Sequence, residues 1–281
     1  MTTKHIDMHL HTNCSDGTYS VEEIFRKAKK ENISAISITD HDTIAAIPSA
    51  LNFSKKYDVE FIPGIEFSCI YKNYNLHILG YFFDIKNKEF LNEINYILKS
   101  REERNSLIIQ KLRNYNIIIN EQKLKNSMNG TVTRANIAKQ MVEEGYVFSV
   151  KDAFSKYLDY DRPCYVKREK ISAEYIINLI HMAGGIAFIA HVNQIKISID
   201  FLESLIRELK NKGIDGIEAY YPEYSEKTFS FCIRMSEKYC LLKSGGSDFH
   251  GKIRNNRLGY GCNNIPIPYS LVEEIKKQKN Y

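Results

Sequence analysis

The segment HIDMHLHTNCSDG, residues 5–17, contains three of the chain's eight histidines. In an extended strand its apolar side chains would point to one face, and Asp7, His9 and His11 would point to the other. Burying two imidazoles and a carboxylate without partners is costly in free energy, and a bound metal ion would offset that cost. The segment therefore predicts a buried strand that carries metal ligands.

The chain alternates short apolar segments with segments of helical periodicity. The further strands are predicted at 34–40, 59–68, 75–83, 184–192, 213–221 and 239–250. A helix is predicted to begin at Ser20, where Glu23 completes a capping box. The other helices in this pattern are predicted at about 43–57, 172–183, 198–211, 225–238 and 270–278. Such alternation favours a parallel sheet, and the number of units fits a closed β/α barrel.

The middle of the chain, from about residue 88 to 163, shows helical periodicity and no convincing strand. FLNEINYILKSREERNSLIIQKLRN, residues 90–114, predicts one long amphipathic helix. Shorter helices are predicted at about 133–145 and 150–158. We therefore expect a helical insertion that crosses one end of the barrel. The predicted boundaries are 1–98 and 164–281 for the barrel and 99–163 for the insertion.

The composition is that of an ordinary globular protein, with 43% apolar and 26% charged residues. The six cysteines form no Cys-x-x-Cys pair, no apolar signal region begins the chain, and no apolar run is long enough to cross a membrane. We expect a cytoplasmic protein with no membrane contact and no obligate protein partner. Residues 99–170 carry 15 Lys and Arg against 9 Asp and Glu. This basic excess suggests an anionic substrate, although a solvated helical surface would explain it equally well.

Histidines and carboxylates recur where the predicted strands end. After the first strand, these residues are Asp40, His41, Asp42, Glu66, His191, Asp248 and His250, and His77 lies in the fourth strand. Each motif alone has a structural alternative, such as a helix cap for Thr39–Asp42 or a hydrogen-bonded core residue for His77 or His191. Together they predict convergence, because the carboxyl ends of barrel strands surround the active site. Imidazole and carboxylate ligands without thiolate admit Mn, Fe or Zn, and their number exceeds what one ion needs. We expect two or three divalent ions.

Six motifs resemble, in order, those of the PHP (polymerase and histidinol phosphatase) superfamily. They are DMHLHTNCSDG (7–17), ITDHDT (38–43), GIE (64–66), HILGY (77–81), AHV (190–192) and SGGSDFHG (244–251). The stretches GIEAYYPEYS, REERN and TRANIA are most similar to a small bacterial branch. That branch contains nucleoside 3',5'-bisphosphate phosphatases and a 5'-to-3' exoribonuclease. The resemblance implies a distorted (β/α)7 barrel with a helical insertion.

The resemblance also implies a set of metal ligands. His9, His11 and Asp248 would hold a first ion, and Glu66 would bridge it to a second. His77 and His191 would complete the second site, and Asp16, His41 and His250 would hold a third ion. Asp7 and Asp40 would orient ligating imidazoles. Val192 stands where the family usually has proline, which should leave the neighbouring ligand unchanged.

The implied reaction is hydrolysis of a phosphate ester by a hydroxide that bridges two metal ions. We expect these ions to be Mn, with Fe or Zn as alternatives. The catalytic residues would be Glu66, Asp248, His191 and Arg134. Phosphate would be bound by Arg134, and by Arg101 and Arg104 unless these two form a surface ion-pair face with neighbouring glutamates. Lys252, Arg254 and Arg257 are further phosphate candidates, and Tyr220 and Tyr221 are candidates for stacking on bases.

One position departs from the branch, whose insertion motif usually reads Arg-Pro-His after a threonine. Here it reads Thr133-Arg134-Ala135-Asn136. Asn136 can donate a hydrogen bond to a substrate but cannot act as a general acid near neutral pH. Either asparagine replaces a binding histidine or the substrate differs.

Three other functions compete with a nucleotide phosphoesterase. A histidinol-phosphate phosphatase would need an acidic pocket for the substrate amine, whereas the insertion is basic. An amidohydrolase would usually bridge its metals with a carbamylated lysine, and no lysine stands at a motif strand end. A non-catalytic metal-binding PHP module would have lost ligands, whereas this chain keeps all nine.

Overall fold

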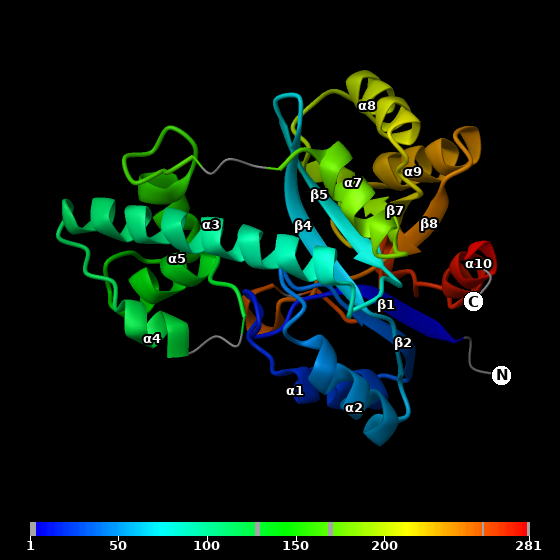
Figure 1. Ribbon diagram of the computed structural model, residues 1–281, viewed down its shortest axis with the longest axis horizontal. Coiled ribbons are helices and arrows are strands. Elements are labelled where there is room, and N and C mark those ends of the chain that lie inside the picture. The colour runs from blue at the N-terminus through cyan, green and yellow to red at the C-terminus, as the bar shows by residue number, and fades with distance from the viewer. Residues whose placement is uncertain (1–3, 127–129, 168–170, 255, 280–281) are drawn as a thin grey trace.

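The fold is a mixed α/β core with a helical extension on one side (Figure 1). The computed structural model describes residues 4–126, 130–167, 171–254 and 256–279. Within these residues, no helix is both long and apolar enough to cross a membrane.

The strands form two sheets, which isolated bridges link to each other. A parallel three-stranded sheet has the order β1 (His5–Leu10), β2 (Ile33–Ile38), β3 (Glu60–Phe61). A five-stranded sheet has the order β4 (Gly64–Tyr71), β5 (Tyr74–Tyr81), β6 (Ile186–Ile189), β7 (Gly216–Tyr220), β8 (Leu242–Gly245). Isolated bridges join Leu10 to Phe249 and His41 to Glu66. The expected α/β class is confirmed, while closure into a continuous seven-stranded barrel stays a prediction.

The expectation of an all-parallel sheet is wrong for β5, which pairs antiparallel with both β4 and β6. No helix separates β4 from β5, because residues 72 and 73 alone connect them, with Lys72 in the left-handed region (φ 52°). A connection this short can only join antiparallel strands. His77 lies within β5, as predicted, opposite Ser68 of β4.

The strand predicted at 59–68 is two strands in different sheets. Ile62 donates to the carbonyl of Ile36 and so stays with the first sheet. Pro63, which has no N–H to donate, follows it, and β4 begins at Gly64. The break lets Glu66 reach the centre of the second sheet's edge, beside His41.

The helices of the core lie where the sequence pattern predicts them. They are α1 (Val21–Lys30), α2 (Ile47–Tyr57), α7 (Ala173–Met182), α8 (Ile199–Asn211), α9 (Glu226–Lys238) and α10 (Ser270–Gln278). The capping box of Ser20 and Glu23 is present at the start of α1. Helix α2 begins at Ile47 rather than near 43, with Pro48 in its first turn, where a missing N–H is harmless.

The long helix predicted in the middle of the chain is α3 (Lys88–Arg113). It is followed by α4 (Glu121–Asn126), α5 (Arg134–Glu143), α6 (Val150–Ala153) and a π-helical turn at Phe154–Leu158. The first half of α3 packs on the sheet through Phe90, Ile94 and Ile97. Its second half belongs to a separate apolar cluster that includes residues of α5 and α6. The change of cluster falls between residues 97 and 108, around the proposed boundary at 98/99.

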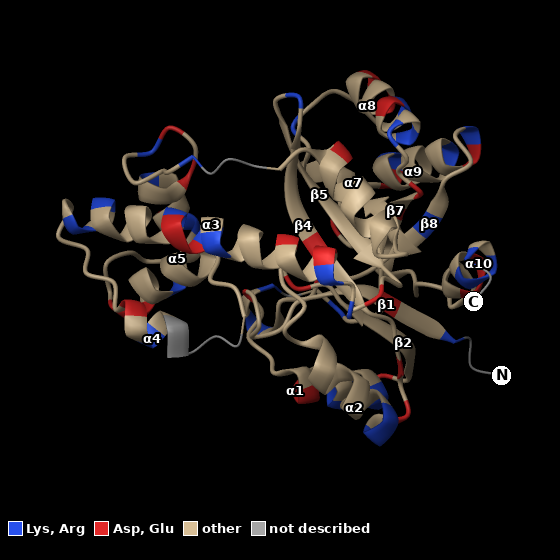
Figure 2. Ribbon diagram, viewed as in Figure 1, with Lys and Arg blue, Asp and Glu red and all other residues tan. Residues whose placement is uncertain are grey.

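Figure 2 shows that α3 carries both acidic and basic side chains. The basic excess of the middle segment therefore does not give this helix a surface of one sign. The buried arginines described below account for part of that excess.

Candidate metal centre

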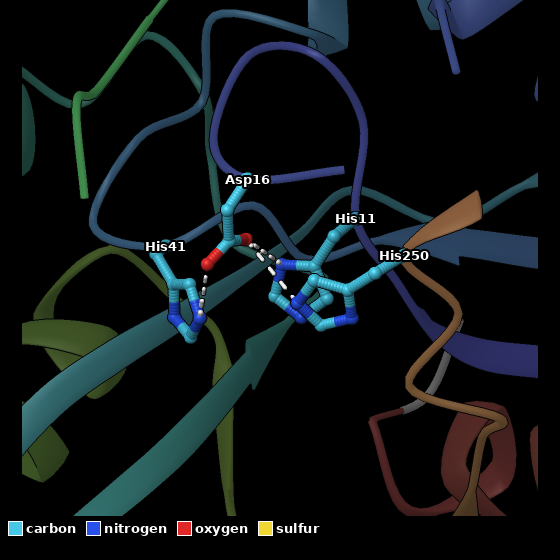
Figure 3. Close-up of side chains that lie close together, drawn as sticks. All are labelled: His11, Asp16, His41 and His250. Carbon is cyan, nitrogen blue, oxygen red and sulfur yellow. Dashed lines mark ion pairs between the residues drawn. The ribbon is translucent and has the colours of Figure 1, made fainter. Parts of the chain in front are cut away.

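The nine side chains predicted as metal ligands converge on one place. Asp16 lies at the centre of one group, with its carboxylate between His41 on one side and His11 and His250 on the other (Figure 3). Its oxygens lie 3.2 Å from His250 Nε2, 3.6 Å from His41 Nε2 and 3.7 Å from His11 Nδ1. Three separate segments, around residues 11–16, 41 and 250, therefore supply one cluster that could hold a cation.

Glu66 connects this cluster to the rest of the site. Its Oε2 lies 3.0 Å from His41 Nδ1, 3.1 Å from His11 Nε2 and 3.4 Å from His9 Nε2. Its Oε1 lies 2.7 Å from His77 Nδ1 and 2.9 Å from His191 Nε2. One carboxylate thus has a group of imidazoles at each oxygen, the arrangement that a bridging ligand needs.

Asp248 closes the site from the end of β8. Its Oδ1 lies 3.3 Å from His11 Nε2, 3.4 Å from His250 Nδ1 and 3.6 Å from His9 Nε2. The backbone of Asp248 is left-handed (φ 50°), a conformation that aspartate tolerates better than most residues. This turn brings its carboxylate back over the strand end toward β1.

Unpartnered buried atoms test whether these residues fit metal ions. His9 Nε2, His11 Nε2, His41 Nδ1 and Glu66 Oε2 are buried and make no hydrogen bond. All three nitrogens lie within 3.4 Å of that one oxygen. Buried polar atoms normally have partners, and lone pairs aimed at a shared point suit a cation of the hard or borderline class. The donor set therefore fits divalent metal ions.

The pKa values of the clustered side chains also agree with a site that binds cations. Burial alone would raise the pKa of Glu66, but the imidazoles of His41, His77 and His9 outweigh it and hold that pKa well below its usual range. Burial opposes protonation of His41 too, yet the carboxylates of Glu66 and Asp16 raise its pKa to about 9. Burial lowers the pKa of His77 to about 4, which leaves its imidazole neutral. The negative charge of the carboxylates demands balancing cations, which protons on histidine or bound metal ions would supply.

Glu218 of β7 supports two of these ligands and was missed by the sequence analysis. It is fully buried, lies 2.8 Å from His9 Nδ1 through Oε1, and accepts a hydrogen bond from the backbone N–H of His191 through Oε2 (2.7 Å). Contacts of this kind fix the tautomer of a ligating imidazole. The available signal was a lone glutamate in a predicted buried strand, GIDGIEAYY, which no spacing rule linked to the histidines.

Asp7 and Asp40 do not touch imidazoles in the way that was predicted. Asp7 accepts hydrogen bonds from backbone N–H groups of His9, Ser247 and Gly259, and burial raises its pKa to about 6. Asp40 accepts hydrogen bonds from Thr12 and Ser15, on the loop that carries Asp16. Both carboxylates therefore position the backbone that bears the ligands, because their side chains are enclosed by N–H and hydroxyl donors.

A cavity of about 180 Å³ opens beside the ligands. Asp16, His41 and His77 line it from the core, and three arginines line it from the helical extension: Arg101, Arg104 and Arg134. Arg101 and Arg104 are buried rather than displayed on a helix surface, so the alternative of a solvated ion-pair face is wrong. Arg101 donates to Asp42 (2.5 Å) and to Ser68 (3.0 Å). The guanidinium of Arg134 lies over the rings of Phe154 and Tyr165 and donates to the carbonyl of Leu158.

Asn136 ties the helical extension to the ligand loop. It completes the capping box of α5 with Thr133, and its Nδ2 donates to the carbonyl of Ser15 (3.1 Å), next to Asp16. The side chain thus bonds to Thr133 and Ser15, and the contact with substrate expected of it stays a prediction.

The remaining candidates for binding phosphate or a base differ in their contacts and exposure. Arg254 pairs with the carboxylate of Asp248. Tyr221 is fully buried and donates to the same carboxylate (2.9 Å), so it cannot stack on an incoming base, and that suggestion was wrong. Tyr220 packs on Phe229. Arg257 is exposed and lies over the ring of Tyr260, and the side chain of Lys252 is exposed as well.

The PHP domain family matches residues 7–228 of this chain. The chain belongs to the PHP domain family. It is 32% identical to a 5'-3' exoribonuclease of Haemophilus influenzae, over 88% of this chain and 90% of the relative. It is 26% identical to a 3',5'-nucleoside bisphosphate phosphatase of Chromobacterium violaceum, over 96% of each chain. The predicted membership is confirmed, and the chain is a metal-dependent phosphoesterase of the PHP family.

Two solved structures have the same fold. One is described as a metal-dependent phosphoesterase from Bifidobacterium adolescentis, with a TM-score of 0.88, 24% identity, and coverage of 98% of this chain and 96% of that one. The other is described as an amidohydrolase from Chromobacterium violaceum, with a TM-score of 0.85 and the same identity and coverage. At this identity the likeness establishes the fold, and the match extends over the PHP core and the helical extension together.

Proposed function

We propose that this PHP protein hydrolyses phosphate esters of nucleotides. The substrate would be a nucleoside 3',5'-bisphosphate, which loses its 3'-phosphate, or a short RNA, which loses nucleotides from its 5' end. One observation carries the proposal: three arginines enter the same cavity as the predicted metal ligands Asp16 and His41. A phosphate oxygen bound by the arginines would lie beside the metal centre.

The nine convergent ligands would hold two or three divalent ions, with Mn as our choice and Fe or Zn as alternatives. Bound there, such ions would lower the pKa of a water molecule and offset the negative charge of the phosphate. Glu66 would keep two ions together through its two oxygens, and Asp248 and His191 would complete their ligand sets. Glu218 would hold His9 in one tautomer by its contact with Nδ1.

The arginines would bind and orient the ester. Arg134 is held against two aromatic rings and a carbonyl, which limits the rotamers it must lose when it binds an anion. Arg101 is fixed by Asp42 and Ser68, so it contributes a positive field rather than a mobile fork. The burial of Arg101 and Arg104 strengthens these charges relative to water.

The lining of the cavity favours a nucleotide over histidinol phosphate. Among its described lining residues, Asp16 is the sole carboxylate, and it lies within the metal cluster. A substrate amine would therefore meet arginines instead of an acidic partner. The names of the exoribonuclease and bisphosphatase relatives agree with this choice. The complete ligand set, together with the cavity, speaks against a non-catalytic module.

The test is phosphate or nucleotide release by Mn-loaded protein from three substrates. They are adenosine 3',5'-bisphosphate, a short 5'-phosphorylated RNA, and histidinol phosphate. We expect turnover of the bisphosphate or the RNA and little turnover of histidinol phosphate. Arg134→Ala should lower kcat/KM by roughly 10- to 100-fold, the range for loss of a hydrogen-bonded charge. Arg162→Ala, an exposed arginine of the same region, is the matched control. Preference for histidinol phosphate, or full activity of the Arg134 variant, would contradict the proposal.

A further inference from the structure

A second cavity adjoins the catalytic one and has a different character. Its volume is about 310 Å³, at the lower end of the roughly 300–1,000 Å³ range for small-molecule sites. It lies between α3 and the segment that precedes α5, and Arg101 lines both cavities. A ligand could therefore place one part at the metal ligands and another part here.

The walls of this second cavity combine an apolar part with polar side chains. Leu98 and Ile109 of α3 line it together with Leu124 and Val132. Such walls suit a flat, weakly polar group.

Among the described residues that line the cavity, Asn105 has a buried oxygen without a hydrogen-bond partner. Asn105 is 5% exposed, and its Oδ1 makes no hydrogen bond. The orientation of the amide is determined, because its Nδ2 donates to the carbonyl of Val132 (2.8 Å), and a carbonyl can only accept. Asn105 therefore offers a buried acceptor in a cavity that lies next to the metal centre.

The charges of the described lining residues favour a neutral donor over a phosphate. Among them the cation is Arg101, which is already bonded to Asp42 and Ser68. Two acidic residues, Glu102 and Glu121, also line it. The phosphate would thus remain with Arg104 and Arg134 in the first cavity, and the uncharged end of the substrate would enter the second.

We infer that this cavity binds the nucleobase of the substrate and that Asn105 Oδ1 accepts a hydrogen bond from an exocyclic amino group of the base. The inference rests on the proposed nucleotide activity and adds a specificity: bases that carry an amino group are preferred over bases that lack one. A base without an amino group would bind more weakly, because it would leave the buried oxygen of Asn105 without a hydrogen-bond partner.

The experiment compares two substrates that differ in one group. Adenosine 3',5'-bisphosphate carries the amino group, and purine riboside 3',5'-bisphosphate lacks it. We expect wild-type protein to prefer the adenosine compound by roughly tenfold in kcat/KM, the worth of one hydrogen bond at an enclosed site. In Asn105→Leu that ratio should fall close to one. The ratio is taken within each protein, so the loss of the bond to Val132 affects both substrates alike.

Ser106→Ala is the matched control, because Ser106 lines the same cavity and should leave the preference unchanged. The dissociation constants of both nucleotides, measured by calorimetry, give a second readout that needs no turnover and should show the same preference. Equal kcat/KM values and equal affinities in the wild type, or an unchanged preference in Asn105→Leu, would overturn the base site while leaving the phosphoesterase activity intact. If the protein hydrolysed neither the bisphosphates nor the RNA, the proposed function would be contradicted. The base site would then be tested by affinity alone, and equal dissociation constants for the two nucleotides would refute it.

Discussion

Replacing Glu218 by glutamine should weaken metal binding without changing the shape of the side chain. The two carboxylate oxygens face two different groups, the Nδ1 of His9 at 2.8 Å and the backbone N–H of His191 at 2.7 Å. Glutamine has one oxygen and one NH₂ group. In either orientation, one of those two groups must face the NH₂, so one buried contact becomes a conflict between donors.

The size of the effect follows from what Glu218 holds. The residue is fully buried, so water cannot repair the lost contact. An unsatisfied buried donor costs about 1–3 kcal/mol. Loss of a residue that supports metal ligands weakens metal binding by about 10- to 100-fold, which corresponds to about 1.4–2.7 kcal/mol. The two ranges agree, and we expect Glu218→Gln to raise the metal dissociation constant by that factor.

The assay is titration of Mn into metal-free protein by calorimetry, together with the Mn concentration that gives half-maximal turnover. Glu237→Gln makes the same substitution at an exposed position of α9 and serves as the control. Unchanged Mn affinity in Glu218→Gln, with the control also unchanged, would refute the argument that Glu218 positions His9 and His191.

Three further outcomes are expected. Glu66→Ala should remove bound metal and turnover together, as measured by elemental analysis and phosphate release; wild-type turnover would show that no ion depends on its bridge. Added Mn should raise the Tm, with a stabilisation of about 2.7 kcal/mol at a hundredfold excess over Kd, and a chelator should reverse the shift; a Tm indifferent to both would speak against a structural metal site. Asn136→Ala should lower the Tm through loss of about 1 kcal/mol for each lost hydrogen bond, to Thr133 and to Ser15, with Asn193→Ala as an exposed control; a Tm unchanged by Asn136→Ala would mean that these bonds contribute nothing to stability.

The strand–helix pattern of the core could be read from the sequence because local signals agree with the final packing. The capping box at Ser20 and the buried strand at the start of the chain both occur as predicted. The pairing of β5 could not be read in the same way. Its apolar pattern is that of any buried strand, and its direction is set by the short turn at residues 72 and 73. An expectation of parallel strands joined by crossover helices gives no weight to this turn. The break at Pro63 was hidden for a similar reason, since one apolar run covers both strands.

The convergence of histidines was predictable because ligands at strand ends occupy one edge of a sheet, whereas the roles of the surrounding carboxylates were not. Asp7, Asp40 and Glu218 are all buried acids near ligands, and sequence spacing treats them alike. Their roles differ because of what the fold places opposite each one: N–H and hydroxyl groups at Asp7 and Asp40, and an imidazole at Glu218. The partner of Glu218 is 209 residues away in the chain. A carboxylate that orients a ligand is therefore defined by a long-range contact, and only the folded structure distinguishes it from one that braces a loop.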